Sequence, residues 1–591
     1  AGDPTFTVGI GNTDTISGTI SDGTTPGDVV KAGDGTLILS AINSYTGATT
    51  VDAGTLNVTG SIASSSLTTV NSGATLLGTG AVGNLEVASG GIFAPGAAGI
   101  AGGSTTVSGT LTLGIGSTYL VAVNPSTASY ADVSGTASLH GTVLAAFDTG
   151  AYVGRQYTIL QSAGLDHTTF DNLSVTDLPS GFAASLEYTD NDVLLDLTAV
   201  LGAGDTLDRN QRNVADGLNT YFNNGGTMPS NFLTIFGLSG GNLAGALSGL
   251  SGEVATGGSA GSFRLMSQFL GLLSGTPEMG AGGGTLSFAP EGGPALPAVA
   301  SAYAPTAAAA APSDGQWKLW GTGFGSANRV DGDPVAGSHR VTSNDYGFAA
   351  GADYGYSADT VLGFAVAGGG TSWDLARGLG GGDSDALQLG LHAATRFGPA
   401  YVSAALGFAN HWMTTDRAAY GDRLSADFKA QLYAGRLEAG YRLAPTATLG
   451  LTPYAALQVQ HFRSPGYSET DVGGGGYALA YEARSMTDTR SELGARLDQA
   501  TMLGGDRLVL KVGAAWAHDH VTGNSATAGF RSLPGSSFTV SGADTPHDTA
   551  LVSTGAELQL AANLTLSASF DGEFASGYRS LGGTGVLRYS W

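Results

Sequence analysis

The pentapeptide GLSGG is the first stretch whose residue types could do chemistry. It places Gly237, Ser239 and Gly241 at the spacing of a nucleophile elbow, in which a serine between a strand and a helix is activated by His and Asp partners. In a chain with 95 glycines such a match is expected by chance, and the flanking sequence is typical of a linker. We therefore predict no esterase site at Ser239.

His518, Asp519 and His520 form a second candidate, because imidazole and carboxylate groups are common metal ligands. They fall at the end of a predicted strand, where we expect polar side chains on the outer rim of the fold. The sequence thus predicts no catalytic residue, no cofactor and no metal site.

The charged residues of the C-terminal half form a more regular pattern. They recur on one face of alternating strands, while apolar residues such as Leu564, Leu566 and Phe570 occupy the other face. Both signs of charge are present, so these side chains can pair across a hydrated interior and hold a threaded segment by hydrogen bonds. The predicted set is Arg436, Glu438, Arg442, Glu492, Arg496, Asp498, Lys511, Glu557, Asp571, Glu573 and Arg588.

The elements that must position these charges are about twelve long strands between residues 316 and 591. An even count allows an antiparallel barrel to close with both ends on one side. Tight turns alternate with mostly longer loops, as in an outer-membrane barrel, whereas a soluble sandwich is the alternative that alternation alone leaves open. The last two strands are expected at 564–579 and 584–591. No run of about 18 apolar residues occurs, which excludes a transmembrane helix.

The N-terminal region contains repeats. A unit close to V-x-x-G-x-L begins at Val51, Val70, Val87, Val107 and Val133. One short strand and a Gly turn per repeat of about twenty residues predict a right-handed parallel β-helix over 1–145, with a Gly-rich β-sandwich as the alternative. Residues 146–200 contain short runs bounded by Gly, Asp and Pro, which predict a small β-cap.

Between cap and barrel the periodicity becomes helical. Leu207, Val214, Leu218 and Phe222 share one helical face, with Asp205 as the expected N-cap. A second helix is expected near 253–273, followed by an extended Gly-, Ala- and Pro-rich linker, so that 201–315 is a helical and Gly/Ala/Pro-rich connection of which a part threads the barrel. Either that helix or the linker near 295–313 could occupy the pore, and we favour the helix. The predicted fold class is all-β: a β-helix, a short helical linker and a 12-stranded antiparallel transmembrane β-barrel over 316–591.

Composition limits the possible partners. The chain of 591 residues has a formal net charge of −24, only 12% charged residues and no cysteine. An acidic chain without a basic patch does not bind nucleic acid, and the lack of cysteine mildly supports export through a narrow pore. The start AGDPTF has no basic and apolar leader, so a leader was cleaved or the chain is a fragment.

Two distant regions resemble bacterial autotransporters of type V secretion. The first is KAGDGTLILSAINSYTGATTVDAGTLNV, which resembles a passenger-associated repeat, and the second comprises TRSELGAR and FDGEFASGYRSLGGTGVLRYSW, which are similar to the β-domain. The resemblance implies a translocator that inserts in the bacterial outer membrane and delivers its own β-helical passenger, an adhesin or stalk, to the cell surface. The cap would then act as an autochaperone.

The resemblance also implies partners and a terminal assembly signal. Tyr589 and Trp591 would be recognised by the barrel-assembly machinery, and periplasmic chaperones, outer-membrane lipid and a host or cell-surface ligand are the other expected partners of a monomer. Some family members cut themselves at an Asn-Asn pair, but Asn223 and Asn224 lie far before the first barrel strand. Alternatives are a surface anchor for a protease or esterase domain upstream of this chain, and a plain porin.

Overall fold

The computed structural model describes residues 3–150, 152, 155–274 and 317–590. The chain divides into two compact units, one of Ala1–Thr206 with Leu218–Leu243 and one of Leu207–Gly217 with Ala244–Trp591. Each unit is described by itself.

Three sheets of parallel strands form the body of the first unit, and each coil from β5 to β19 contributes one strand to each sheet. The first sheet contains β1 (Thr5–Thr7), β3 (Val29–Ala32), β5 (Thr49–Val51), β8 (Thr68–Val70), β11 (Leu85–Val87), β14 (Leu111–Leu113) and β17 (Ala137–Ser138). The second contains β2 (Thr13–Ile16), β4 (Thr36–Leu39), β6 (Gly54–Val58), β9 (Ala74–Gly78), β12 (Ile92–Pro95), β15 (Thr118–Val123), β18 (Thr142–Phe147) and β20 (Asn172–Thr176). The third contains β7 (Ser61–Ile62), β10 (Ala81–Val82), β13 (Ser104–Val107), β16 (Tyr130–Val133), β19 (Gln156–Gln161), β22 (Asp192–Ala199) and β21 (Phe182–Tyr188), of which the β19–β22 and β22–β21 pairs are antiparallel.

The coils are held together by columns of apolar side chains. Leu56, Leu76, Phe93, Tyr119 and Val143 follow one another in register through the second sheet, and each is 0% exposed. Each coil thus buries its side chains on the coils above and below, which is how a solenoid forms a continuous core.

The predicted repeat is wrong at two of its five valines, which stack in a different sheet. Val51, Val70 and Val87 stack in the first sheet as expected, but Val107 and Val133 stack on each other in the third sheet. The reason is that β13 closes the same coil that β11 opens, so a valine with similar flanking residues occurs twice in that coil.

Four helices follow among the described residues: α1 (Arg209–Asn223), α2 (Ser230–Phe236), α3 (Gly240–Leu250) and α4 (Val254–Ser274). The predicted N-cap is wrong by three residues. Asp208 Oδ1 accepts from the Gln211 amide and Gln211 Oε1 from the Asp208 amide, at 2.8 and 3.0 Å, which is a reciprocal capping box. Asp205 instead accepts from the amide of Gly240. Within the described residues, no helix is both long and apolar enough to cross a membrane.

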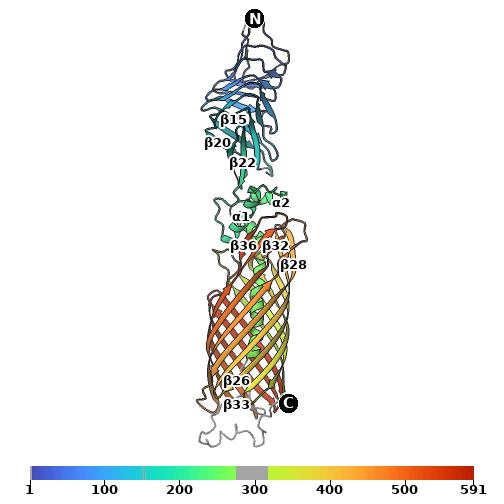
Figure 1. Cartoon of the computed structure of the whole chain (residues 1–591), viewed down its shortest axis with the longest axis vertical. Coiled ribbons are helices and arrows are strands. Elements are labelled where there is room, and N and C mark those ends of the chain that lie inside the picture. The colour runs from blue at the N-terminus through green and yellow to red at the C-terminus, as the bar shows by residue number, and fades with distance from the viewer. Residues whose placement is uncertain (1–2, 151, 153–154, 275–316, 591) are drawn as a thin grey trace. The chain divides into compact units, whose positions relative to one another are not determined.

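The second unit is dominated by a closed antiparallel barrel of twelve long strands within the described residues, which Figure 1 shows with tilted strands. Neighbours in sequence pair throughout, β39 pairs with β23, and β27 with β28 completes the ring. The strands are β23 (Trp317–Val330), β24 (Val341–Gly355), β25 (Thr360–Leu375), β26 (Gly381–Phe397), β27 (Ala400–Ala419), β28 (Asp422–Tyr441), β29 (Leu449–Ser464), β33 (Arg484–Leu503), β34 (Asp506–Thr522), β37 (Asp548–Ala561), β38 (Leu564–Ala575) and β39 (Tyr578–Ser590).

Shorter strands occupy the two longest loops of the barrel, β29–β33 and β34–β37. β30 (Tyr467–Ser468), β32 (Leu479–Tyr481), β35 (Ser525–Phe530) and β36 (Phe538–Ser541) form a separate four-stranded sheet, while β31 (Thr470–Asp471) extends the barrel at β28. Both loops lie at the end of the barrel opposite the tight turns, so this end is covered by ordered structure. We call it the loop end.

The barrel is apolar outside and polar inside. On β26 Leu389 is 49% exposed whereas Gln388 is 1% exposed, and on β33 Leu493 is 58% exposed whereas Glu492 is 6% exposed. This polarity is that of a transmembrane barrel. Together with the parallel coils of the first unit, it confirms the predicted fold class.

The final hairpin departs from its predicted bounds. The chain turns at residues 576–577, where Gly577 has φ +70°, and not near residue 581. A positive φ is accessible to glycine at little cost. Gly582 and Gly583 lie within β39, paired with Ser326 and Gly325, so the Gly-rich run that suggested a turn belongs to the strand.

Candidate functional site

The lumen of the barrel holds α4, seen in Figure 1 as the green helix inside the strands. The helix has 21 residues, so at ~1.5 Å per residue it is about 30 Å long and matches a hydrocarbon core. It lies against β24–β29, and Phe263, Met266, Phe269 and Leu270 are buried in a cluster with apolar wall residues. The linker near 295–313 lies outside the described residues.

Glycines let α4 approach the wall closely. A Cβ at Gly257 would lie 2.4 Å from Trp373 Cδ1, and a Cβ at Gly261 would lie 2.3 Å from Thr371 Cγ2. Trp373 is 2% exposed, and its Nε1 donates to the carbonyl oxygen of Val254 at 3.3 Å. Trp373 and Thr371 therefore fit against α4 only because Gly257 and Gly261 carry no side chain.

Polar contacts fix the middle of α4. Ser267 Oγ accepts from Gln458 Nε2 at 2.8 Å and from Gln460 Nε2 at 2.9 Å, and Arg264 Nη2 donates to Ser343 Oγ at 2.9 Å. Because these partners come from β24 and β29, they constrain both the depth and the rotation of the helix.

Four of the predicted lumen charges and one tyrosine from the wall form the first polar cluster of the interior. Glu438 is 1% exposed and accepts from Arg496 at 2.6 and 3.0 Å, from Arg436 at 3.0 Å and from Tyr401 Oη at 2.7 Å. Arg436 also forms a two-pronged ion pair with Glu492 at 2.9 and 2.7 Å. Such bidentate pairs are strong and directional, so this cluster ties β28 to β33 and, through Tyr401, to β27.

Further predicted lumen charges pair in the same interior. Arg442 donates to Asp498 at 2.5 and 2.6 Å near the tight turns, and Lys511 Nζ donates to Glu557 at 2.7 Å. Asp571 accepts weakly from Ser569 at 3.4 Å. Arg588 and Asp571 both line the cavity described below.

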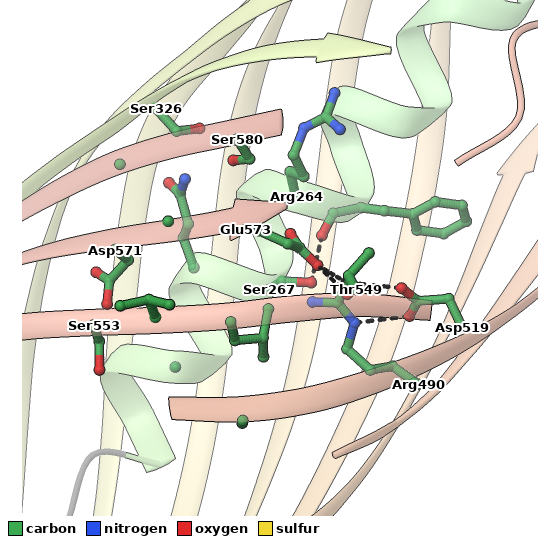
Figure 2. A pocket seen from close by; sticks show the side chains of 18 of the residues that line it. Arg264, Ser267, Ser326, Arg490, Asp519, Thr549, Ser553, Asp571, Glu573 and Ser580 are labelled. Carbon is green, nitrogen blue, oxygen red and sulfur yellow. Dashed lines mark hydrogen bonds and ion pairs between the residues drawn. The ribbon is translucent and has the colours of Figure 1, made fainter. Parts of the chain in front are cut away.

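A second cluster surrounds Arg490, a residue that sequence inspection did not single out. Figure 2 shows its guanidinium between Asp519 and Glu573, with bonds of 2.7 and 2.8 Å to Asp519 and a further contact with Glu573. Glu573 also accepts from Thr549 at 3.1 Å and Tyr578 at 2.9 Å. The prediction of a surface position is wrong for Asp519, which is 5% exposed.

The reason is strand alternation. Asp519 points into the lumen, whereas His518 is on the other face, where its Nδ1 lies 2.9 Å from Asp548 Oδ1 and both side chains are well exposed. The His-Asp-His triplet is thus split between two faces. Among the described residues, no group of three or more His, Asp or Glu side chains could hold a metal ion.

On the side of the lumen away from β24–β28, α4 leaves a cavity of about 520 Å³. It is lined by helix residues such as Arg264 and Gln268 and by residues of β33, β34, β37, β38 and β39. Buried polar atoms face it without a protein partner, including Gln268 Oε1 and Asp488 Oδ1. A roomy, polar cavity with such atoms holds water, so the lumen is packed on one side and hydrated on the other.

The two remaining candidates lie next to or at the end of helices. Ser239 lies between α2 and α3 and does not follow a strand, so it lacks the elbow context. Asn223 ends α1, and its side chain bonds the backbone amide and carbonyl of Ala199 at 2.8 and 3.1 Å.

The C-terminal aromatic pair is described only in part. Tyr589 lies on the apolar face near the tight turns and is 45% exposed. Phe397 and Tyr441 lie on the same face near the tight turns and are 66% and 49% exposed. Aromatic residues favour the interface between hydrocarbon and headgroups. Trp591 lies outside the described residues, and recognition of the pair stays a prediction.

An apolar exterior, a charged interior and a helix inside a closed ring define an outer-membrane barrel protein. Two family models match the chain: "Autotransporter beta-domain" at residues 319–571 and "Passenger-associated-transport-repeat" at residues 29–58. The barrel region of the chain therefore belongs to the autotransporter β-domain family, and this domain lies in the outer membrane.

Curated relatives share parts of the sequence. An extracellular serine protease of Serratia marcescens is 26% identical over 268 residues, 44% of this chain and 25% of that protein. The adhesin BmaC autotransporter of Brucella suis biovar 1 (strain 1330) is 47% identical over 91 residues, 15% of this chain and 3% of that protein. The chain therefore spans a quarter or less of the length of these relatives.

Solved structures of similar barrels include two translocator domains. That of the autotransporter NalP from Neisseria meningitidis is 13% identical, covers 46% of this chain and 88% of its own, and has a TM-score of 0.38. The β-domain of the Bordetella autotransporter BrkA is 18% identical, covers 47% of this chain and 100% of its own, and has a TM-score of 0.37. Both scores are low, and the family assignment rests on the sequence models.

Proposed function

We propose that this chain is a translocator that delivers its own N-terminal β-helix through the outer membrane to the cell surface. The observation that carries the proposal is α4 inside the closed barrel. Its first residues lie at the loop end, where Glu253 bonds His339 of the β23–β24 loop, and its last residues point toward the tight turns. A chain in this position already has everything before α4 on the loop side of the membrane.

The lumen charges have a role in this passage. Arg436, Glu438, Glu492 and Glu573 keep the interior wet and offer exchangeable hydrogen bonds to a moving backbone. In this proposal the barrel itself performs no catalysis; it supplies a polar path, and α4 occupies that path when the passage is complete.

Assembly needs partners that this proposal takes from the family. The β-domain is inserted among outer-membrane lipids by the barrel-assembly machinery, with periplasmic chaperones holding the unfolded chain and Tyr589 and Trp591 as the assembly signal. The proposal takes the protein as a monomer, since a single chain supplies every strand of the closed barrel.

The passenger is proposed to be an adhesin or stalk without enzymatic activity. Support comes from the likeness to a Brucella adhesin autotransporter and from the uninterrupted solenoid core of the first unit. The functional segments are then a β-helical passenger over 1–145, an autochaperone cap over 146–200, a connection over 201–315 and the barrel over 316–591. The ligand is a molecule of the host or of another cell surface.

A second candidate is favoured by the Serratia protease relative. In that case the β-helix is the stalk of a protease domain that precedes Ala1 in a longer protein. An active-site serine probe applied to the surface protein of the native strain would label a larger polypeptide only in this second case.

The absence of cysteine from the sequence permits a sharp test. Ser66 lies in an exposed turn of the β-helix, and Thr446 lies in the tight turn between β28 and β29. With a membrane-impermeant maleimide on intact cells, we expect Ser66→Cys to be labelled and Thr446→Cys to be protected until the cells are permeabilised. Protection of both variants in intact cells would refute delivery to the surface.

A further inference from the structure

The junction of α3 and α4, residues 249–255, is bound at the loop end by three wall or loop side chains. Arg417 Nη1 donates to the carbonyl oxygen of Gly249 at 2.8 Å, and Tyr481 Oη donates to that of Gly252 at 3.1 Å. Arg484 Nη2 donates to the carbonyl oxygen of Ala255 at 2.7 Å. Donors from β27, β32 and β33 thus converge on one stretch of backbone.

One of these donors, Arg417, belongs to a buried ion pair with Glu469. Arg417 Nε and Nη2 each bond a different oxygen of Glu469 at 2.7 Å, and the two side chains are 1% and 2% exposed. Glu469 also accepts from the Leu479 amide at 2.8 Å, and its Oε1 lies 3.1 Å from Tyr481 Oη, whose one proton it shares with the carbonyl oxygen of Gly252. A buried ion pair is favourable only when its remaining hydrogen bonds are made, and for Arg417 Nη1 the partner is the carbonyl of Gly249.

The same residues organise the loops above the barrel. Glu469 lies between β30 and β31, Leu479 and Tyr481 lie on β32, and Arg531, just after β35, donates to the carbonyl oxygen of Glu469 at 2.7 Å. The loop sheet and the bound segment therefore share one network. Loss of the segment would leave the buried Nη1 of Arg417 without this acceptor and would leave Tyr481 Oη with Glu469 alone.

Backbone carbonyls occur in every peptide, so selectivity must come from shape. Gly252 has φ +67°, and a Cβ there would lie 2.3 Å from Tyr481 Oη and 2.4 Å from Leu479 Cδ1. Any other residue would be strained by the backbone and would collide with β32. The next residue, Glu253, is 2% exposed and accepts from the His339 amide at 2.6 Å and contacts its Nδ1 at 2.7 Å. The site thus fits a Gly-Glu pair.

We propose that Arg417, Glu469 and Tyr481 form a latch that recognises residues 249–253 and closes the loop end of the barrel around them. This inference rests on the proposed translocation and deepens it, because the latch fits the Gly-Glu pair and not the passenger that precedes it. Closure on arrival of this segment defines where export stops. It couples a short linker sequence to the folding of the loop sheet.

The coupling is tested by changing the linker and observing the loops. In the full chain, Gly252→Ala should weaken protection from hydrogen exchange about 100-fold in the peptides covering 477–483 and 525–530. This is the effect expected when a buried ion pair loses one of the hydrogen bonds that make it favourable. Gly225→Ala is the matched control, since Gly225 also has a positive φ but has no atom near its missing Cβ. A heat-modifiable barrel band verifies that each variant folds.

A second pair of variants covers the wall side. Tyr481→Phe keeps the ring and should weaken the same protection about tenfold, while Arg423→Gln, which removes a 75% exposed arginine from the same end of the barrel, should not. The latch would be overturned if loop protection were unchanged in both Gly252→Ala and Tyr481→Phe while the chain that carries only Ser66→Cys was labelled on intact cells. Translocation would then still stand. If the chain that carries only Ser66→Cys were not labelled on intact cells, translocation itself would be refuted.

Discussion

The glycine face of α4 yields a prediction whose magnitude follows from the structure. Gly257 packs against Trp373, with 2.4 Å available where a Cβ contact needs well over 3 Å, whereas Gly271 lies in the same helix with no atom within 4 Å of its missing Cβ. Alanine at either position gains the same helix propensity, about 1 kcal/mol. That gain cancels when the two variants are compared.

The two variants then differ in the free energy of seating α4 only by the steric strain at position 257. Overpacking by one methyl against a rigid wall costs about 1–3 kcal/mol, because Trp373 is held by its bond to Val254 and cannot move freely. We expect Gly257→Ala to favour displacement of α4 from the lumen by about 5–150-fold relative to Gly271→Ala, the range to which ~1–3 kcal/mol corresponds.

Conductance measures the displacement directly. Full-length protein in planar bilayers should open far more often as Gly257→Ala than as Gly271→Ala, because the freed lumen conducts more ions. Adding Trp373→Phe should restore the closed state by making room for the methyl. Equal open probabilities for the two alanine variants, or no rescue by Trp373→Phe, would refute the packing account of how the helix is seated.

Other predictions concern the lumen charges and the β-helix. The double substitution Glu492→Gln and Glu573→Gln should slow surface display in a pulse-chase experiment while the amount of barrel stays unchanged. Normal display would contradict the role given to these charges. Lys31 is 0% exposed and its Nζ donates to three carbonyl oxygens, so Lys31→Met should destabilise the β-helix by about 1–3 kcal/mol for each buried acceptor left unpaired, seen as a lower unfolding midpoint of the passenger. Burial raises the pKa of Tyr45 to about 12, above the ~10 of an unfolded tyrosine, so its stabilising contribution is complete below pH ~10 and is lost as the pH rises through 12. Absorbance titration should show Tyr45→Phe removing one late-ionising tyrosine, and an unchanged titration curve would contradict this.

Much of the architecture could be predicted because alternation and repeats are local properties. The barrel strands, their even number and the charged inner face follow from period-two patterns, and the solenoid follows from recurring valines. The misplaced hairpin at Gly577 and the misassigned Val107 show the limit. In both cases a second glycine run or a second valine fitted the same local pattern, and only strand pairing distinguishes them.

The contacts that seat the helix and close the loop end could not be predicted. Arg417 and Glu469 are 52 residues apart in sequence, and nothing local marks either as buried. Arg490 and Asp519 meet only because neighbouring strands bring them together. Gly257 and Gly252 looked like any others among 95 glycines, since their purpose is set by Trp373 and Tyr481 on distant strands.

The central claim is delivery of the N-terminal part to the outside while the barrel stays in the membrane. Its most direct test is protease added to intact Gram-negative cells that express the chain with an epitope tag at Ala1. The account predicts loss of the tag together with survival of a heat-modifiable outer-membrane fragment of about the size of residues 300–591. A tag that resists protease in intact cells but is removed after permeabilisation would place the β-helix in the periplasm and contradict the account.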